Sequence, residues 1–222
     1  MYQLDDDGVL RVPAFKPFPW LEHGFGTRQS GDWPPEKERA TLKQIHSTLT
    51  VTASTPGVLG QGDALATNQP GLFVAIKTAD CIPVLLVDPE RRAVAAVHAG
   101  WRGTAGNIVR SAIDTLVSEF HTDPAGLWAA IGPGIRVCCY EVSGQVAEQF
   151  AAWMPELAGA PDGTMLDLME VNRRQLIERG VRPDRLFSPA GWCTRCDRER
   201  LHSFRRDGAA AGRMYSAIRI QF

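Results

Sequence analysis

The sequence predicts an α/β (α+β) fold in which mixed β-sheet is flanked by helices. Short apolar runs rich in strand-forming residues recur between residues 72 and 132, and segments with helical periodicity lie between and after them. A chain of 222 residues is long enough to bury a full hydrophobic core. Because we find neither an internal repeat nor a long linker, we expect a single domain over residues 1–222.

The strands are predicted from runs of four to nine residues that are rich in apolar and strand-forming residues. Residues 72–78, "LFVAIKT", are rich in β-formers, and residues 93–98 form a continuous apolar run of the length of an interior strand. Pro83 is expected to interrupt the run between them, so that only 84–87 forms a short buried strand. The remaining expected strands are 127–132, 185–188 and 214–222.

One long helix is predicted over residues 105–120. Its apolar residues recur on one face, and Pro124 cannot continue it. Residues 142–153 and 165–179 are expected to form two further helices, the second ending at Gly180. Residues 27–38 contain two consecutive prolines and are expected to form an exposed loop.

The composition of the chain argues against nucleic acid and membranes as partners. The formal net charge of −1 gives no electrostatic reason to expect nucleic acid or an anionic membrane, and no apolar run approaches the length of a transmembrane helix. The N-terminus "MYQLDDDGVL" carries three aspartates where a signal peptide would carry lysine or arginine. Five cysteines, an odd number, also fit a reducing compartment. We therefore expect a cytoplasmic protein without a nucleic-acid or membrane partner, while its oligomeric state is not predicted.

Three residues could form a metal site. Cys81 follows one expected strand, His98 ends the next, and His46 lies in a half-apolar stretch, "LKQIHSTLT". Two histidines and one cysteine with a fourth position open are typical of a catalytic zinc site. The alternatives are that Cys81 is buried core and that His46 is an ordinary imidazole. The residue types and spacings alone leave both interpretations open, because spacings of 35 and 17 residues match no short metal motif.

The segment "HAGWRGTAGN" precedes the predicted 105–120 helix. Backbone N–H groups at a helix start favour an anion, and Arg102 could add a bidentate contact, so Gly100, Gly103 and Arg102 are candidate phosphate-binding residues. The alternative is that the glycines allow a helix and a strand to pack closely.

Three charged residues lie near these candidates in the sequence. Lys77 interrupts an apolar strand, so we expect its ammonium group to reach a carboxylate or the pocket. Asp63 is a candidate catalytic residue, and Asp80 could orient a ligand histidine. Either aspartate could instead belong to a turn.

The other four cysteines are predicted to be structural thiols. Cys193 and Cys196 form a "CTRC" pair, but a structural zinc site needs a second pair at similar spacing, whereas Cys138 and Cys139 are adjacent. The nearby "FRRDG" segment, with Arg205, Arg206 and Asp207, belongs either to the pocket or to a solvated turn.

Residues 62–103, which include "TADC" and "HAGWRG", closely resemble the core of the family once described as polyphenol oxidase or laccase-like, whose members are now described as purine nucleoside phosphorylases. Residues 131–142 and 193–214 resemble two later blocks of that family. The resemblance implies a single domain of layered mixed β-sheets with flanking helices, similar to the cytotoxic necrotizing factor catalytic domain. It also implies Zn²⁺ bound by His46, Cys81 and His98. Residues 29–43 form a shorter segment than the family usually has there.

The implied activity is phosphate-dependent cleavage of adenosine or inosine to free base and ribose 1-phosphate, with adenosine deamination as a second activity. Cys81, His98 and Asp63 would serve the reacting centre, and Arg102, Lys77, Gly100 and Gly103 the substrates. The alternatives are a thiol hydrolase using Cys81 and His98, a peptidoglycan-precursor editing amidase, and a binding module. Copper can also bind such a site in vitro, but five histidines are too few for a multicopper oxidase.

Overall fold

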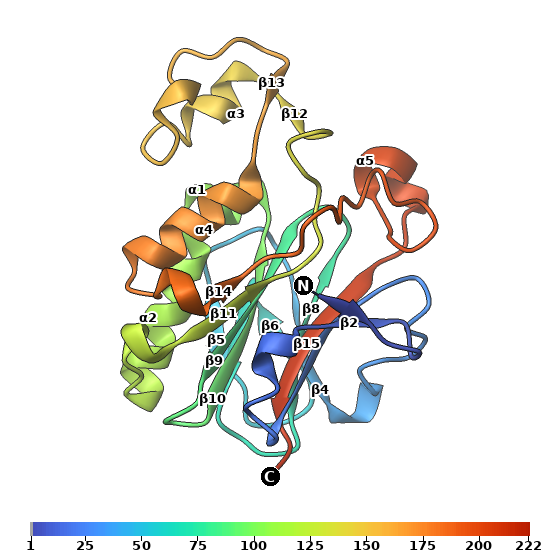
Figure 1. Ribbon diagram of the computed structural model, residues 1–222, viewed down its shortest axis with the longest axis vertical. Helices are drawn as coiled ribbons and strands as arrows, with labels where there is room; N and C mark the ends of the chain where they lie inside the picture. The colour runs from blue at the N-terminus through green and yellow to red at the C-terminus, as the bar shows by residue number, and fades with distance from the viewer. Residues whose placement is uncertain (1) are drawn as a thin grey trace.

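The computed structural model describes residues 2–222, in which two β-sheets pack face to face and helices cover the outer face of one of them (Figure 1). The larger sheet has the strand order β1 (Gln3–Leu4), β2 (Val9–Arg11), β3 (Leu21–Gly26), β15 (Met214–Ile220), β8 (Phe73–Thr78), β4 (Arg39–Lys43) and β6 (Gly57–Gln61). The smaller one has the order β14 (Leu186–Phe187), β11 (Trp128–Ile131), β9 (Ile82–Asp88), β10 (Ala93–Ala99), β7 (Ala64–Thr67) and β5 (Thr50–Thr52). A separate two-stranded sheet pairs β12 (Glu141–Val142) with β13 (Thr164–Met165).

Both large sheets are mixed, as the sequence predicts. In the larger sheet β4 runs parallel to β6 and β8, while β15 is antiparallel to β3 and β8. In the smaller sheet β10 is antiparallel to β7 and β9, while β5–β7 and β11–β14 are parallel pairs. The predicted α/β (α+β) class is confirmed.

The central strands are buried on both faces. Along β9, Val84 and Leu86 pack toward the helices, whereas Leu85 and Val87 pack toward the other sheet. Successive side chains of a strand point to opposite faces, so a strand covered on both sides needs an unbroken apolar run. This explains why β9 and β10 have no polar alternation.

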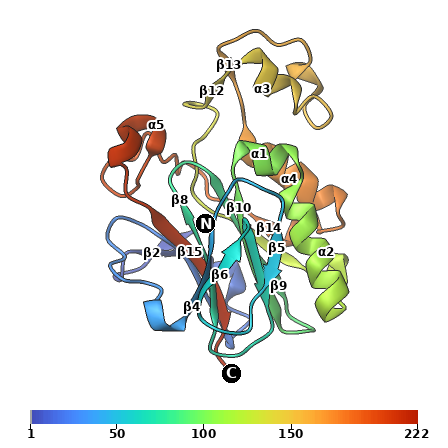
Figure 2. The same ribbon diagram turned by 180° about the vertical axis from the view of Figure 1, so that it is seen from behind.

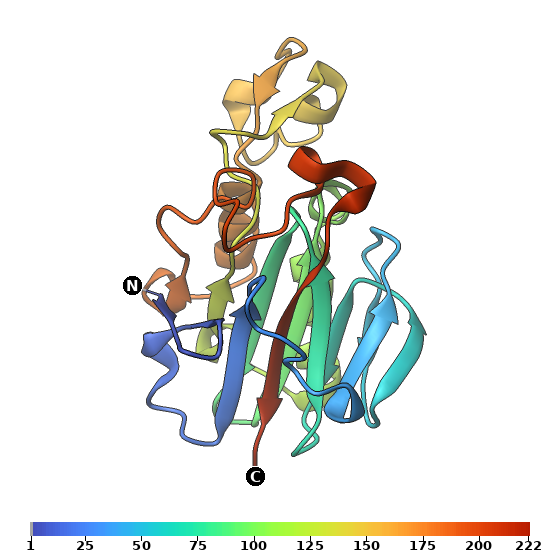
Figure 3. The same ribbon diagram turned by 90° about the vertical axis from the view of Figure 1, so that its right-hand side faces the viewer.

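The helices lie on the smaller sheet and at one end of the molecule. Figure 2 shows α1 (Trp101–Ala105), α2 (Ile108–Phe120) and α4 (Leu168–Glu178) on the same side. Viewed across the sheets in Figure 3, α5 (Phe204–Asp207) and the excursion with α3 (Gly144–Glu148), β12 and β13 lie beyond one end of the strands. Short 3₁₀ helices span Pro13–Phe15, Glu36–Glu38, Pro124–Gly126, Pro155–Leu157, Pro183–Arg185 and Gly208–Ala210.

Several predicted boundaries were wrong. Pro83 does not interrupt β9, because it is the second residue of the strand and its carbonyl still accepts a hydrogen bond from the N–H of Gly132 at 2.8 Å. The 105–120 helix is two helices, since Asn107 has a left-handed φ of 64° between α1 and α2. The 142–153 helix covers only α3, and the strands before residue 72 were not predicted.

The strand pairing brings distant segments to one end of the smaller sheet. The start of β9 lies beside the end of β10, with Ile82 opposite Ala99 and Pro83 opposite His98. The start of β7 lies on the other side of β10, and the N–H of His98 donates to the carbonyl of Asp63 at 2.7 Å. Among residues 2–222, none of the helices combines the length and apolar character that a membrane crossing requires.

Candidate metal centre and cavity

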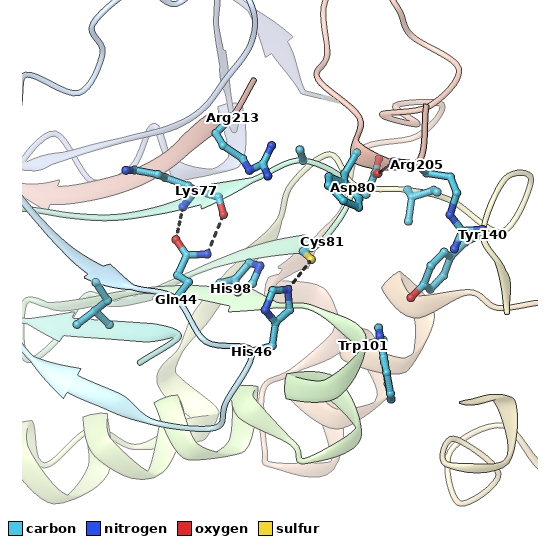
Figure 4. A pocket seen from close by; sticks show the side chains of 14 residues that line it. Gln44, His46, Lys77, Asp80, Cys81, His98, Trp101, Tyr140, Arg205 and Arg213 are labelled. Carbon is cyan, nitrogen blue, oxygen red and sulfur yellow. Dashed lines mark hydrogen bonds between the residues drawn. The ribbon is translucent and has the colours of Figure 1, made fainter. Parts of the chain in front are cut away.

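His46, Cys81 and His98 come together at this end of the smaller sheet. Each offers one ligand atom, and these atoms all lie within 4.8 Å of one another. The Cys81 Sγ is 4.0 Å from His46 Nε2, and the two imidazole rings are 5.0 Å apart between centroids (Figure 4). The side chains are therefore close enough to share one metal ion.

Asp63 contacts the His98 ring and the backbone of the loop that carries His46. Its Oδ1 lies 2.8 Å from His98 Nδ1, which leaves Nε2 of that ring free to bind a metal. The same carboxylate accepts hydrogen bonds from the backbone N–H groups of Ile45, His46 and Ser47 and from the Ser47 hydroxyl. His46 has a φ of 58°, an unfavourable backbone conformation that these hydrogen bonds stabilise. Asp63 is completely buried, so it acts by positioning the loop and the ring.

Gln44 attaches the same loop to the neighbouring strand. Its side-chain amide donates to the carbonyl of Lys77 and accepts from the N–H of Lys77, both at 2.8 Å (Figure 4). This pair of hydrogen bonds imitates a strand partner at the end of β8. The loop that carries His46 is thus held from two sides, by Gln44 and by Asp63.

The pKa values of Cys81, His98 and Asp63 depend strongly on one another. Burial raises the pKa of the Cys81 thiol, whereas hydrogen bonds and charge from His46 and His98 lower it by more, to about 6. Burial lowers the pKa of His98, whereas its interactions with the Asp63 carboxylate and the Cys81 sulfur raise it by more, to about 9. Burial raises the pKa of Asp63, and its hydrogen bonds from His98 and Ser47 lower it by more, to well below its usual range. A thiolate that is already formed at neutral pH is suited to bind a metal cation.

Gly100 makes room for the three side chains. A Cβ atom at this position would lie 2.8 Å from His46 Cδ2 and 3.1 Å from Cys81 Sγ. Gly103 likewise approaches the carbonyl of Ser47, where a Cβ atom would lie at 3.1 Å. The glycines thus allow close packing against the loop that carries His46, which is the alternative we gave for them. The helix that follows Gly100 has only five residues, because α1 ends at Ala105.

A cavity of about 630 Å³ opens over the three side chains. Its lining contains the triad, three cationic side chains and three aromatic ones, together with the side chains of Gln44, Ala79, Asp80, Leu42 and Ile135. The cations are Lys77, Arg205 and Arg213, and the aromatic rings belong to Trp101, Tyr140 and Phe204. A pocket of this size that combines apolar walls with a few polar groups is typical of a small-molecule site.

Of the other predicted site residues, some lie where the sequence analysis expected them and others do not. Lys77 lines the cavity, with its Nζ 5.3 Å from the centre of the Tyr215 ring. Arg102 is not among the lining residues, since its guanidinium lies over the Trp101 ring at 4.2 Å. Asp80 does not bond a ligand histidine; it accepts hydrogen bonds from the Thr194 hydroxyl and from the N–H of Arg205.

Five polar or aromatic lining residues were missed from the sequence, namely Gln44, Trp101, Tyr140, Phe204 and Arg213. Most of them follow or precede motif residues in loops, and no periodic pattern marks a loop residue. The prediction about the remaining cysteines also needs correction. Cys138, Cys139, Cys193 and Cys196 form a second group, with all ligand atoms within 4.8 Å of one another, although two of them are adjacent in sequence.

Known proteins resemble this chain over most of its length. A purine nucleoside phosphorylase of Clostridium acetobutylicum is 34% identical over 193 residues, covering 86% of this chain and 80% of the relative. A purine nucleoside phosphorylase of Deinococcus radiodurans is 41% identical over 184 residues, covering 81% and 69%. An adenosine deaminase from an unknown prokaryotic organism is 35% identical over 162 residues, covering 70% and 61%.

A solved structure and a family model agree with these similarities. YlmD from Geobacillus stearothermophilus superposes with a TM-score of 0.89 at 26% sequence identity, covering 100% of this chain and 99% of the other. The family model described as multi-copper polyphenol oxidoreductase laccase matches residues 27–221. The chain therefore belongs to the multi-copper polyphenol oxidoreductase laccase family.

Proposed function

We propose that this protein is a zinc-dependent purine nucleoside phosphorylase that cleaves adenosine or inosine with phosphate. The observation that carries the proposal is the group His46, Cys81 and His98, whose ligand atoms lie within 4.8 Å of one another at a cavity. The similarity to relatives named purine nucleoside phosphorylase supports the choice of substrate. The products are the free base and ribose 1-phosphate.

The residues of the centre fit a zinc ion. They supply two imidazoles and a thiol whose pKa is lowered, and the hydrogen bond from His98 Nδ1 to Asp63 fixes the ring with Nε2 free. A zinc ion held by three protein ligands would supply Lewis-acid polarisation at its open position. His46, Cys81 and His98 would hold it, and Asp63 would keep the His98 ring and the backbone at His46 in place.

The cationic side chains are proposed to bind phosphate. Lys77, Arg205 and Arg213 line the cavity, and none of the ion pairs formed within residues 2–222 involves any of them. Guanidinium groups match the oxygens of phosphate in geometry. The N–H groups of Arg205 and Arg213 that make no hydrogen bond within the described part of the chain are available to bind it. We therefore propose that Arg205 and Arg213, with Lys77, form the anion site that the sequence assigned to Arg102 and the glycines.

The aromatic side chains are proposed to hold the base. Trp101, Tyr140 and Phe204 can stack on a purine. Burial raises the pKa of Tyr140 to about 12, and the nearby Cys81 charge adds to the effect, so its phenol stays protonated at neutral pH. Tyr140 can therefore donate a hydrogen bond inside the cavity (Figure 4).

The proposed reaction is a displacement at the anomeric carbon of ribose. A phosphate oxygen forms a bond to C1′ while the bond from C1′ to the base nitrogen breaks. The electron pair of that bond goes to the purine, which takes up a proton. Cationic side chains keep the phosphate beside C1′, and orienting both reactants in one cavity lowers the entropic cost of their encounter.

The test is to incubate zinc-loaded protein with inosine, with and without phosphate, and to separate the products by chromatography. Hypoxanthine and ribose 1-phosphate should form only when phosphate is present. Equal release of hypoxanthine without phosphate would mean hydrolysis. Adenosine should be tested in parallel, because a relative is named adenosine deaminase and release of inosine would reveal that second activity.

A thiol hydrolase, including an amidase that edits peptidoglycan precursors, is the second candidate. Asp63 is hydrogen-bonded to His98, and ligand atoms of His98 and Cys81 lie within 4.8 Å of each other, an order like that of an orienting carboxylate, a base and a nucleophile. One sulfur cannot be both a zinc ligand and a free nucleophile. Rapid alkylation of Cys81 in protein that contains no metal and is nevertheless active on an amide substrate would favour this candidate.

We also propose a cytoplasmic location. All five cysteines are free thiols, the state that a reducing compartment maintains. Fractionation of cells that express the tagged full chain tests this proposal.

A further inference from the structure

A second group of potential metal ligands lies outside the cavity, where two loops meet. Cys138 and Cys139 lie in the loop between β11 and β12, and Cys193 and Cys196 lie in the loop between β14 and α5. The Cys139 and Cys196 sulfurs are 3.4 Å apart, those of Cys138 and Cys139 are 3.7 Å apart, and those of Cys138 and Cys196 are 3.9 Å apart. All four sulfurs lie within 4.8 Å of one another.

We propose that Cys138, Cys139, Cys193 and Cys196 bind a second zinc ion as four thiolates, in a closed structural site. Four sulfurs at about 2.3 Å from a tetrahedral zinc ion lie about 3.8 Å from each other. The three sulfur–sulfur distances of 3.4, 3.7 and 3.9 Å lie close to this value on both sides. A disulfide would need two sulfurs at about 2.05 Å, and it would leave the other two thiols without a function.

Cys193 fixes the group to the protein interior. It is the most buried of the four, at 4% exposure. Its carbonyl accepts a hydrogen bond from the N–H of Asp197 at 2.9 Å, which closes the turn that carries Cys196. The backbone therefore holds Cys193 and Cys196 on one turn, as two ligands of one metal ion require.

The charge around the group also fits. A zinc ion with four thiolates carries a net charge of −2, which needs compensation near a protein surface. A hollow beside Cys139 and Cys196 is lined by four arginines, namely Arg195, Arg198, Arg205 and Arg206. Their positive charge offsets that of the site.

The position of the group suggests what the metal does. Gly134 and Cys193 form an isolated β-bridge, and the N–H of Thr194 donates to the carbonyl of Gly134 at 3.1 Å. One loop supplies Tyr140 to the cavity, and the other leads to Arg205. A zinc ion shared by both loops would fix these two walls relative to each other. The inference goes beyond the proposed function, since it concerns a site that takes no part in the chemistry.

The experiment uses the full chain with Cys81→Ala, which removes one ligand of the first site. We expect this variant, purified under reducing conditions without a chelator, to retain about one zinc ion per chain, with only sulfur neighbours near ~2.3 Å in its X-ray absorption spectrum. The double variant Cys81→Ala/Cys138→Ser should contain no zinc. Cys138 is exposed, so the serine should not disturb folding, which circular dichroism would verify.

The result that would overturn the inference is a folded Cys81→Ala variant that neither contains zinc nor takes up zinc added to the reduced protein. The inference would also be overturned if the protein had a mass lower by two hydrogens before treatment with a reductant, and if peptide mapping assigned this loss to a disulfide bond between two of the four cysteines. Neither outcome depends on nucleoside turnover. Failure of the proposed function would therefore leave this result unchanged.

Discussion

The two groups of potential metal ligands differ in what surrounds them. His46, Cys81 and His98 offer three ligands, are oriented by the buried carboxylate of Asp63, and open onto a cavity. The four cysteines offer four ligands of one kind and lie on two loops near the surface. A catalytic zinc site keeps one coordination position open, whereas a structural site is saturated. The comparison teaches that the number of ligands and their access to a cavity separate the two roles better than burial alone.

The largest expected effect is a loss of kcat/KM that is much greater when a ligand of the first group is removed than when one of the four cysteines is replaced. Cys81→Ala should lower kcat/KM for inosine phosphorolysis by at least about 10³-fold, because the electrostatic centre is lost. Cys196→Ser should lower it by about 10-fold or less and act mainly through KM, since it only loosens the cavity wall. Steady-state kinetics on both variants checks this prediction. Equal losses in kcat would show that the two groups do not have separate roles.

A smaller effect is expected from the residue that orients the first group. Asp63→Asn should weaken zinc binding there by roughly 10–100-fold, because an amide holds the His98 ring less firmly and adds no negative charge. The matched control is Asp88→Asn. Asp88 is also buried, and its carboxylate accepts hydrogen bonds from the backbone N–H groups of Glu90 and Arg91 in a turn. Competition with a zinc indicator measures both affinities. An unchanged affinity in Asp63→Asn would contradict the orienting role.

The pH dependence of metal binding should differ between the groups. In the first group the Cys81 pKa is about 6 and the His98 pKa is about 9, so between these values the thiol is ionised and the imidazole is protonated. Zinc must displace that one proton, so affinity should rise about tenfold per pH unit from pH 6 to 9 and level off above pH 9. Below pH 6 the Cys81 proton must also leave, and the dependence should steepen.

In the second group at least two protons must leave near neutral pH. Hydrogen bonding to Cys139 and Cys193 raises the pKa of Cys196 to about 12, and burial with neighbouring thiols raises the pKa of Cys138. Calorimetry in buffers of different ionisation enthalpy counts these protons. The variant with Cys196→Ser should release about one proton per zinc at pH 7.5, and Cys81→Ala should release two or more. Equal proton counts would contradict the assignment of the charges.

The smallest expected effect comes from a single methyl group. Gly100→Ala would place its Cβ atom 2.8 Å from His46 Cδ2, so the ring must shift. Strain of this kind costs roughly 1–2 kcal/mol, or about tenfold in zinc affinity at the first group only. Gly126→Ala is the control, since no atom lies within 4 Å of the added methyl group there. If zinc also bound more weakly to the four cysteines in the Gly100→Ala variant, the two groups would be coupled.

The central strands were predictable for physical reasons, because β9 and β10 are buried on both faces and therefore have continuous apolar runs. Cys81 directly precedes β9 and His98 lies near the end of β10, but only the resemblance to a known family selected these two residues with His46 as one site. Most of the strands before residue 72 were missed because they have only two to five residues, too few for an alternating pattern to be recognised; β3, with six residues, is the exception. The single domain over residues 1–222 stays a prediction.

The remaining site residues depend on contacts that spacing does not encode. Asp63 meets His98 because β7 pairs with β10, and Arg205 reaches the cavity from α5, more than a hundred residues after Cys81. The adjacent cysteines argued against a shared metal site only because sequence motifs count spacing along the chain. The loop geometry instead brings Cys138 and Cys139 to the "CTRC" turn.

The most direct test of the central claim is a zinc titration of metal-free Cys138→Ser protein, in which only the first group can bind zinc tightly. Phosphorolysis of inosine is followed at each addition. We predict that the rate rises in proportion to added zinc, reaches its plateau at about one ion per chain, and falls to background when a chelator removes the metal. Metal-free protein that cleaves inosine as fast as the zinc-loaded protein would contradict the claim that His46, Cys81 and His98 hold the catalytic metal.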